Sequence, residues 1–457
     1  MPPGADSSRS KVSPVPISTR LNDGATHDAV ALAGRALPAD SMAQVFFEER
    51  ADLRLELSGR AAPNLAATST RGAAVGEPGR TLHRTDPSLD DLVAMARGDG
   101  RWPFPPVDSE PLSGTPASCF DPEWTAAIEA EVFRRAEIEL AGLPEPRWRA
   151  SIVAFHQKVW VAGTDASVVS DVRGGCRFEI LVGSESHPEV HAAMEWVLAG
   201  NQPEPPAGCF SRAWERLERR RSARPPRPGT TRAVLASGVG GVLVHELVGH
   251  ALEADVVREA PTWIQAALPS ALRMSVIDEP ARGRGGWRVD DEGVATGRTS
   301  LIEDGRVVGL LLDRSTARLH GAPPNGHARR ATYLDPIRPR MGCTYIGHGQ
   351  DDPADIVRET ASGIFIREMS AGHTDPLSGR AVFIVNDADS IVNGAVQEPL
   401  APFIISVDGV EAWRSIDRIG CDLAFDTCVG SCIRDGQPLA VSVGAPTIRI
   451  GVITVEC

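Results

Sequence analysis

A run of almost uniformly apolar residues, 240–253, encloses two histidines and a glutamate: His245, Glu246 and His250. Such a run predicts a buried helix. Burying two imidazoles and a carboxylate costs free energy unless hydrogen bonds or a ligand satisfy them. A zinc ion would do so, with the histidines as ligands and Glu246 beside the metal to take a proton from water. The alternative is a buried helix whose histidines are satisfied by hydrogen bonds alone.

The spacing of the histidines departs from the common zinc-peptidase helix, H-E-x-x-H, in which they are four residues apart. His245 and His250 are five apart. On an ideal helix the two side chains would therefore diverge by roughly 140°. One inserted residue, as in a π-bulge, would bring them back to one face. Gly249 lies inside the interval and could ease that distortion, so a bulge is expected there.

The residues around this helix closely resemble the signature of the TldD/PmbA family of metallopeptidases. The resemblance begins at residues 240–255, and further matches follow in the family's order at 289–293, 298–299, 301–305, 313–318, 329–330, 339–341, 375–379, 432–437 and 443–447. It is good over residues 232–454 and fainter over about 28–200. It implies an N-terminal α/β domain.

The resemblance also implies a third zinc ligand, Cys432, which opens the segment C-x-[KR]-D-G-Q. Two imidazoles and one thiolate would fill three corners of a tetrahedron and leave the fourth open for water. Glu246 would then act as the general base. A buried free cysteine is the alternative for Cys432. Cys428, four residues earlier, is a rival ligand.

The function that follows is zinc-dependent hydrolysis of peptide bonds, with Zn²⁺ as the cofactor. The resemblance implies small or unfolded peptides as substrates. It also implies a heterodimer of a metal-bearing subunit with a metal-free paralogue of the PmbA/TldE kind. This chain keeps the ligands and so resembles the metal-bearing subunit; a homodimer is the alternative.

Two other functions stay open. The first is a zinc amide hydrolase that acts on a modified peptide or a small-molecule conjugate in a natural-product pathway. It is suggested by Leu247, Ala251 and Ala254, where the family commonly has Ala, Gly and Gly, because the bulkier residues could reshape the pocket. The second is a non-catalytic partner subunit, against which the intact candidate ligands argue.

Three further residues are candidates for substrate binding. His373 lies in a loop-like, Gly-containing stretch and could polarise the substrate carbonyl. Arg329 and Arg330 could hold a peptide carboxylate or pair with acidic residues, and pairing is slightly favoured. The acidic run 290–292 could bind a cation, but a polar turn that anchors the fold near the site is the better interpretation.

Composition excludes several classes of protein. The net charge of −13 argues against a nucleic-acid partner, which would need a positive face. Eight cysteines in 457 residues are too sparse for a disulfide scaffold. No signal peptide and no apolar run long enough to span a membrane is visible. The protein is therefore expected to be cytoplasmic, with reduced thiols and no membrane association.

The pattern along the chain indicates an α+β fold: an N-terminal α/β domain and then a mostly β C-terminal domain that carries the zinc-binding helix. The expected divisions are a disordered tail at 1–27, the N-terminal domain at 28–220 and the metallopeptidase domain at 231–457. A basic, proline-containing stretch at 219–230 should be a solvated linker. Helices are expected near 28–37, 89–97, 122–141 and 188–199, and strands at 44–49, 53–57, 151–162, 166–172 and 176–183. Asp304-Gly305 and Asn393-Gly394 indicate hairpins, and Cys432 should lie on a loop just before a strand.

Overall fold

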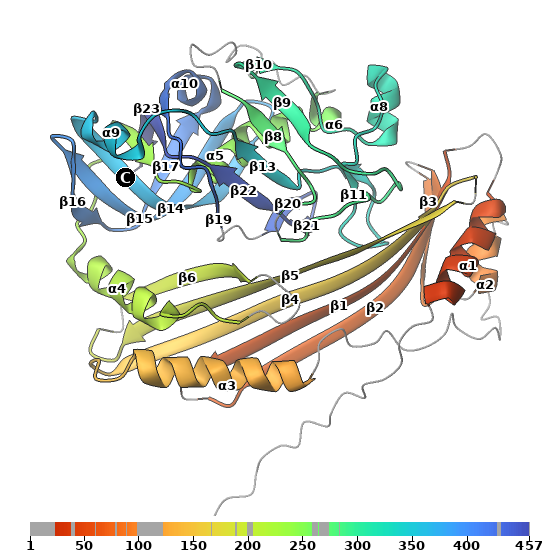
Figure 1. The fold of residues 1–457 in the computed structure, drawn as a ribbon, viewed down its shortest axis with the longest axis horizontal. Helices are drawn as coiled ribbons and strands as arrows, with labels where there is room; N and C mark the ends of the chain where they lie inside the picture. Colours follow the sequence, from red (N-terminus) through yellow and green to blue (C-terminus); the bar gives the residue numbers. More distant parts are fainter. Residues whose placement is uncertain are drawn as a thin grey trace, which may run out of the picture.

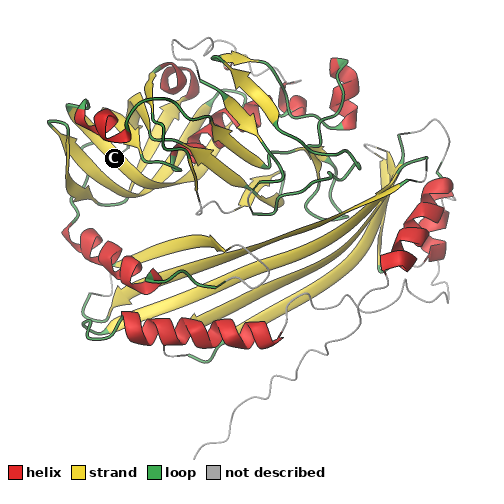
Figure 2. Ribbon diagram, viewed as in Figure 1, coloured by secondary structure: helices red, strands yellow, loops and turns green. Residues whose placement is uncertain are grey.

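The computed structural model describes residues 23–37, 42–59, 61–77, 80–87, 89–97, 122–165, 167–187, 190–198, 204–257, 264, 274–282, 284–426 and 431–456. Most of the expected N-terminal tail, residues 1–22, and the rival ligand Cys428 lie outside these ranges. Helix α1 (Asp23–Arg35) begins within the stretch expected as tail. Helices and extensive sheet are both present, so the predicted α+β class is confirmed (Figure 2).

One long, curved antiparallel sheet forms the N-terminal half of the molecule (Figure 1). Its strands, in spatial order, are β3 (Arg80–Thr85), β2 (Asn64–Glu77), β1 (Gln44–Ser58), β4 (Pro146–Ala162), β5 (Val168–Ser184) and β6 (His191–Leu198). Alternating residues such as Leu53, Leu55 and Leu57 are buried, as expected of strands with one face on a core. One face of the sheet is therefore buried against a core.

Helices cover the sheet on the face turned away from the C-terminal domain (Figure 1). Helix α3 (Pro122–Glu139) packs Val132 into the same core as Leu53. At the far end, α1 and α2 (Leu89–Arg97) pack Val30 and Leu92 beside Phe47. Helix α4 (Cys209–Ser222) lies at the other end and leads into the C-terminal domain.

The structure confirms the helices predicted at 89–97 and 122–141 and corrects three other expectations. The expected strand pair at 44–49 and 53–57 is one continuous strand, β1, and β5 likewise replaces two short strands. The helix predicted near 188–199 is wrong, because the described part of that stretch is strand β6. Its residues pair with β5 from Cys176 to Gly183, and this pairing decides the conformation over local propensity.

The C-terminal domain contains two larger sheets. In the first, β14 (Ser362–Asp375), β7 (Gly229–Leu235), β23 (Ile448–Val455), β17 (Phe403–Asp408) and β15 (Arg380–Val392) pair in turn, and β15 pairs back to β14, so the sheet closes on itself. Strands β16 (Ala395–Leu400) and β18 (Ile416–Ile419) attach to its side. The second sheet runs β10 (Arg306–Val307), β9 (Thr299–Glu303), β8 (Val276–Asp278), β13 (Cys343–Ile346), β22 (Ser442–Ala445) and β19 (Ala424–Asp426).

Short elements complete this domain. They are helices α5 (Gly240–Val244), η1 (His245–Gly249), η2 (His250–Leu252), α6 (Ala254–Val257), α8 (Arg314–His320), α9 (Pro353–Arg358) and α10 (Gly409–Arg414), with strands β11 (Ala328–Arg329), β12 (Arg338–Pro339), β20 (Ser431–Arg434) and β21 (Gln437–Ala440). Both predicted hairpins are present, as β9–β10 and β15–β16. Their turn residues Asp304, Gly305, Asn393 and Gly394 all have positive φ, as type I′ hairpin turns require.

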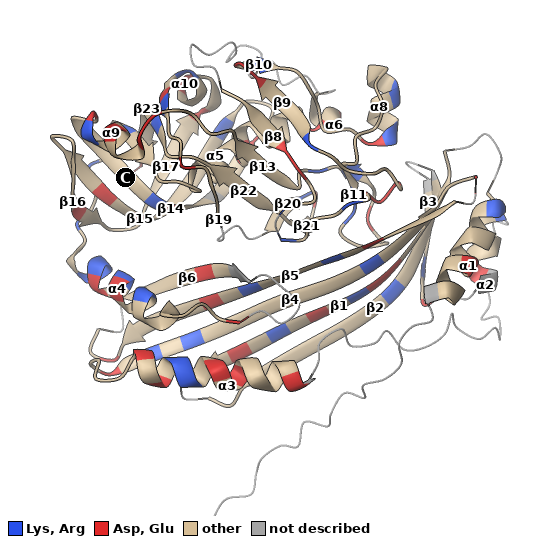
Figure 3. Cartoon of the chain, in the orientation of Figure 1, with Lys and Arg blue, Asp and Glu red and all other residues tan. Residues whose placement is uncertain are grey.

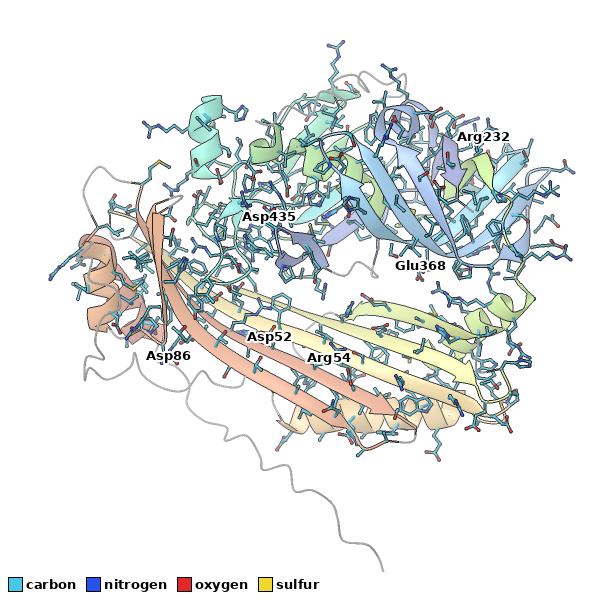
Figure 4. The ribbon with its side chains drawn as sticks, turned by 180° about the vertical axis from the view of Figure 1, so that it is seen from behind. Asp52, Arg54, Asp86, Arg232, Glu368 and Asp435 are labelled. Carbon is cyan, nitrogen blue, oxygen red and sulfur yellow. The ribbon has the colours of Figure 1, made fainter. Side chains whose placement is uncertain are left out.

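Buried arginines and acidic residues join the two halves. Arg173 of β5 donates to Asp291 at 2.6 Å, and neither side chain is exposed. The basic run expected as a solvated linker instead extends α4, and Figure 3 shows basic residues gathered on this helix beside the C-terminal domain. Arg219 donates to Asp389 at 2.7 Å. Figure 4 shows Glu368, the partner of Arg216, at the border of the C-terminal domain nearest α4. Ion pairs therefore contribute to the contact between the halves, beside an apolar cluster that packs Tyr333 against Phe46.

Candidate metal centre

The helix that carries the two histidines contains the expected bulge. Helix α5 changes at His245 into a π-helical turn, and the backbone N–H of His250 donates to the carbonyl of His245. That five-residue bond places the two rings on one face, with centroids 5.1 Å apart. A Cβ on Gly249 would lie 1.8 Å from Sδ of Met341, so only glycine fits there without movement.

Cys432 comes from a tight hairpin close to this helix. Strands β20 and β21 are joined by the turn Asp435-Gly436, whose residues both have positive φ. Cys432 therefore lies in a strand, not on a loop before one. Figure 4 places Asp435 in the part of the C-terminal domain that faces the long sheet. The hairpin carries the thiol to the helix from 182 residues away in the sequence.

Three donor atoms, one each from His245, His250 and Cys432, lie within 4.8 Å of one another. The sulfur is 3.3 Å from Nε2 of His250. A tetrahedral zinc ion with its usual bond lengths would separate a sulfur and a nitrogen ligand by roughly 3.5 Å. Nδ1 of the buried His245 has no hydrogen-bond partner among the described residues. The donor set therefore fits a zinc ion.

A buried carboxylate orients the second histidine. Oε2 of Glu253 lies 3.1 Å from Nδ1 of His250, which leaves Nε2 free to face the sulfur. Burial acts to lower the pKa of His250, but Cys432 and Glu253 outweigh it and raise that pKa well above its usual value. Burial likewise acts to raise the pKa of the Cys432 thiol, but His250 and His245 hold it well below its usual range. The surroundings thus favour a thiolate, the form that binds metals.

Two arginines reinforce this arrangement. Arg434, on the cysteine hairpin, donates to Glu253 at 2.7 Å and to Asp255 at 2.8 Å. Arg340 donates to the carbonyl oxygen and the sulfur of Cys432. The sequence alone predicted no role in the site for Glu253, Asp255, Arg340 or Arg434. The available signals were a carboxylate three residues after His250 and an arginine two residues after Cys432.

A cavity of about 800 Å³ opens at the candidate centre. Glu246, His250 and Cys432 line it, and Oε2 of Glu246 lies 4.0 Å from Nε2 of His250. Glu246 is therefore on the side of the helix to which the candidate ligands point. His373, at the end of β14, lines the same cavity with its neighbours at 372–377. The structure thus brings His373 to the site.

The other two predicted substrate-binding residues are not brought to this cavity. Arg329 is buried, donates to Asp291 and stacks on Trp287 at 4.3 Å. Arg330 is buried over the ring of Phe46, and its backbone N–H donates to Asp291. Arg329 therefore pairs with an acid, as the sequence slightly favoured.

The acidic run 290–292 anchors the fold, as the sequence interpretation favoured. Asp290 accepts backbone hydrogen bonds from Glu292, Val294 and Ala328, and Asp291 receives Arg173 from the long sheet. Three residues depart from the family's usual signature, namely Leu247, Ala251 and Ala254. They are buried in apolar cores and do not line the cavity of the candidate centre. They therefore give no direct reason for a reshaped pocket.

Comparisons with known proteins point to a metallopeptidase family. Residues 228–457 match the family model described as the PmbA/TldA metallopeptidase C-terminal domain. The chain is 30% identical over 323 residues to the "Metalloprotease TldD homolog" of Buchnera aphidicola subsp. Acyrthosiphon pisum, which covers 67% of each protein. It is 27% identical over 229 residues to the "Zinc metalloprotease TldD homolog" of Saccharolobus solfataricus, covering 49% of this chain and 51% of that one.

The fold is also found in a solved structure. The crystal structure of TldE from Thermococcus kodakarensis superposes with a TM-score of 0.71 and 13% identity, covering 95% of this chain and 100% of that chain. At this identity the likeness concerns the fold alone. Among the described residues, no helix combines the length and apolar character needed to cross a bilayer. The family model and the Buchnera relative together show that the chain belongs to the PmbA/TldD family of metallopeptidases.

Proposed function

We propose that this chain is a zinc-dependent peptidase that hydrolyses peptide bonds in small or unfolded peptides, with His245, His250 and Cys432 as the zinc ligands. The observation that carries the proposal is that these three donor atoms lie within 4.8 Å of one another, at a cavity that Glu246 also lines. The name of the Saccharolobus relative supports zinc as the metal. A cavity of about 800 Å³ is large enough for a short extended peptide segment.

The roles of the chain's own groups follow from their positions. When bound, zinc supplies Lewis acidity, which polarises the scissile carbonyl and makes water easier to deprotonate. Glu246 takes a proton from the attacking water as the water oxygen bonds to the carbonyl carbon. The same carboxyl then delivers that proton to the leaving nitrogen as the carbon–nitrogen bond breaks. His373, which lines the same cavity, can donate a hydrogen bond to the carbonyl oxygen as negative charge develops there.

The metal and the base can be tested separately. Purified protein should contain about one zinc per chain by elemental analysis, as a three-ligand catalytic site predicts. Glu246→Gln should keep that zinc but lose peptide hydrolysis by about 10²–10⁴-fold, measured with fluorescence-quenched unfolded peptides. The matched control is Glu303→Gln, an exposed glutamate of β9, which should hydrolyse peptides normally.

Three results would contradict the proposal. Protein without bound zinc would favour a non-catalytic subunit. Undiminished turnover by Glu246→Gln would exclude this residue as the base. Cleavage of small amide conjugates but not of peptides would favour the amide-hydrolase alternative.

We also infer a dimer, with a metal-free paralogue of the TldE kind as the partner and a second copy as the alternative. The support is family membership and the shared fold with a TldE protein. Light scattering of the purified chain, alone and after co-expression with such a paralogue, tests it. A monomer in both samples would refute the inference.

A further inference from the structure

The sulfur of Cys432 has a hydrogen-bond donor besides the histidines. Nη2 of Arg340 lies 3.4 Å from Sγ of Cys432 and 3.0 Å from the carbonyl oxygen of the same residue. Nη1 of Arg340 donates to the carbonyl oxygen of Gln437 at 3.2 Å. One planar guanidinium therefore holds both strands of the hairpin β20–β21 by a fixed fork of donors.

The same guanidinium faces the group that orients His250. Nε of Arg340 lies 3.9 Å from Oε1 of Glu253, an oxygen with no hydrogen-bond partner among the described residues. The other oxygen of Glu253 meets Nδ1 of His250. Arg340 is only 1% exposed, and a buried cation is costly unless neighbouring groups compensate it. Here the compensating groups are the carboxylate of Glu253, which contacts the candidate ligand His250, and the sulfur of the candidate ligand Cys432.

We propose that Arg340 is a positioning residue that fixes Cys432 toward the metal and weakens the charge donation of its sulfur. The inference rests on the proposed function, in which Cys432 binds zinc. A thiolate gives more charge to a metal than an imidazole does and makes it a weaker Lewis acid. A hydrogen bond to the sulfur withdraws part of that charge, as partners of metal ligands do elsewhere. Arg340 thereby offsets the electronic disadvantage of a sulfur ligand in a hydrolytic site.

Arg434 provides a matched control. It lies on the same hairpin and pairs with the same Glu253, but none of its hydrogen bonds reaches the sulfur. A change at Arg434 shows how far the cobalt band and the metal affinity respond to any disturbance of the charged groups around Glu253. A change at Arg340 adds the loss of the sulfur contact.

The test uses the full chain with Co²⁺ in place of zinc, because a thiolate bound to cobalt gives a charge-transfer band in the near ultraviolet. Arg340→Gln cannot reach the sulfur, so its band should move to longer wavelength than that of the wild type. Its zinc affinity, measured by competition with a chromogenic chelator, should fall by about 10–100-fold. Arg340→Lys keeps the positive charge but loses the planar set of guanidinium donors. Its band should move in the same direction by a smaller amount. Arg434→Lys should leave the band where it is.

The outcomes separate this inference from the function on which it rests. Wild-type protein that binds no cobalt would overturn the metal site and the role of Arg340 together. Cobalt binding by folded Arg340→Gln with a wild-type band and wild-type affinity would overturn the role of Arg340 alone. If circular dichroism shows that Arg340→Gln does not fold, Arg340→Lys decides by the same criterion. A band shift of equal size in Arg434→Lys would also overturn the role, because it would show a general disturbance.

Discussion

The carboxyl group of Glu292 is buried at the junction of the two halves, where it accepts a hydrogen bond from the backbone N–H of Arg314. Burial, aided by the nearby Asp290 and Asp313, raises its pKa to about 8 from an ordinary 4.5. Between these two pH values the folded chain keeps a proton that the unfolded chain has released. The free energy of unfolding should therefore fall as the pH rises through this window.

Glu292→Gln removes this titration while keeping an oxygen that can accept from Arg314. The fall in unfolding free energy between about pH 5 and pH 8 should become shallower in the variant, by an amount on the order of a few kcal/mol. Urea denaturation across that range measures it. Glu303→Gln, a change at an exposed site, should follow the wild type. Equal slopes in all three proteins would contradict the shifted pKa.

Single residues differed in how well the sequence revealed them. His245, Glu246 and His250 could be named as candidates from their own motif, and Cys432 from its resemblance to a family pattern; the structure brings the two histidines and the cysteine together. Glu253, Arg340 and Arg434 were missed, because their roles depend on which buried groups they meet. Arg340 reaches Cys432 across 92 residues, and Arg434 reaches Glu253 across 181. No local pattern encodes such contacts.

At the scale of elements, the π-helical turn depends on close packing at Gly249. A methyl group there would collide with Met341, which is itself buried. Gly249→Ala should therefore destabilise the fold by about 1–3 kcal/mol, although alanine alone favours helix by about 1 kcal/mol. Thermal and urea unfolding measure the change.

The double variant Gly249→Ala with Met341→Ala tests the cause. It should lose less stability than the sum of the single changes, because the smaller side chain at 341 admits the methyl group. Gly297→Ala is the matched control, since a Cβ at Gly297 would meet nothing within 4 Å. Additive losses would indicate that the contact with Met341 is not the reason.

Elements with strong local signals were predicted best. The π-bulge followed from histidine spacing, and the two hairpins from Asp-Gly and Asn-Gly turns. Strand β6 was missed because its residues, with Ala192, Ala193 and Met194, suit a helix equally well. Pairing with β5 decides its conformation, and the sequence does not display that pairing.

At the scale of the whole molecule, the docking of the two halves depends on the buried pair of Arg173 and Asp291. Arg173→Met would leave the buried carboxylate of Asp291 with one cationic partner fewer. Removing one partner of a buried pair costs about 3–5 kcal/mol, so calorimetry should show a lower unfolding temperature or separate transitions for the halves. Arg224→Met, in a largely exposed pair with Glu398, should cost at most about 1 kcal/mol. Similar losses in both variants would refute this difference.

The position of β7 also bears on how a newly made chain acquires its shape. This strand leads into the helix of the candidate centre, yet it is bonded on one side to β14 and on the other to β23. During synthesis, β7 leaves the ribosome long before either neighbour exists. One edge of β7 can pair once β14 (Ser362–Asp375) has emerged, but the other edge stays unpaired until β23 closes the ring. The demand for chaperones in the cell should therefore persist until β23 has emerged.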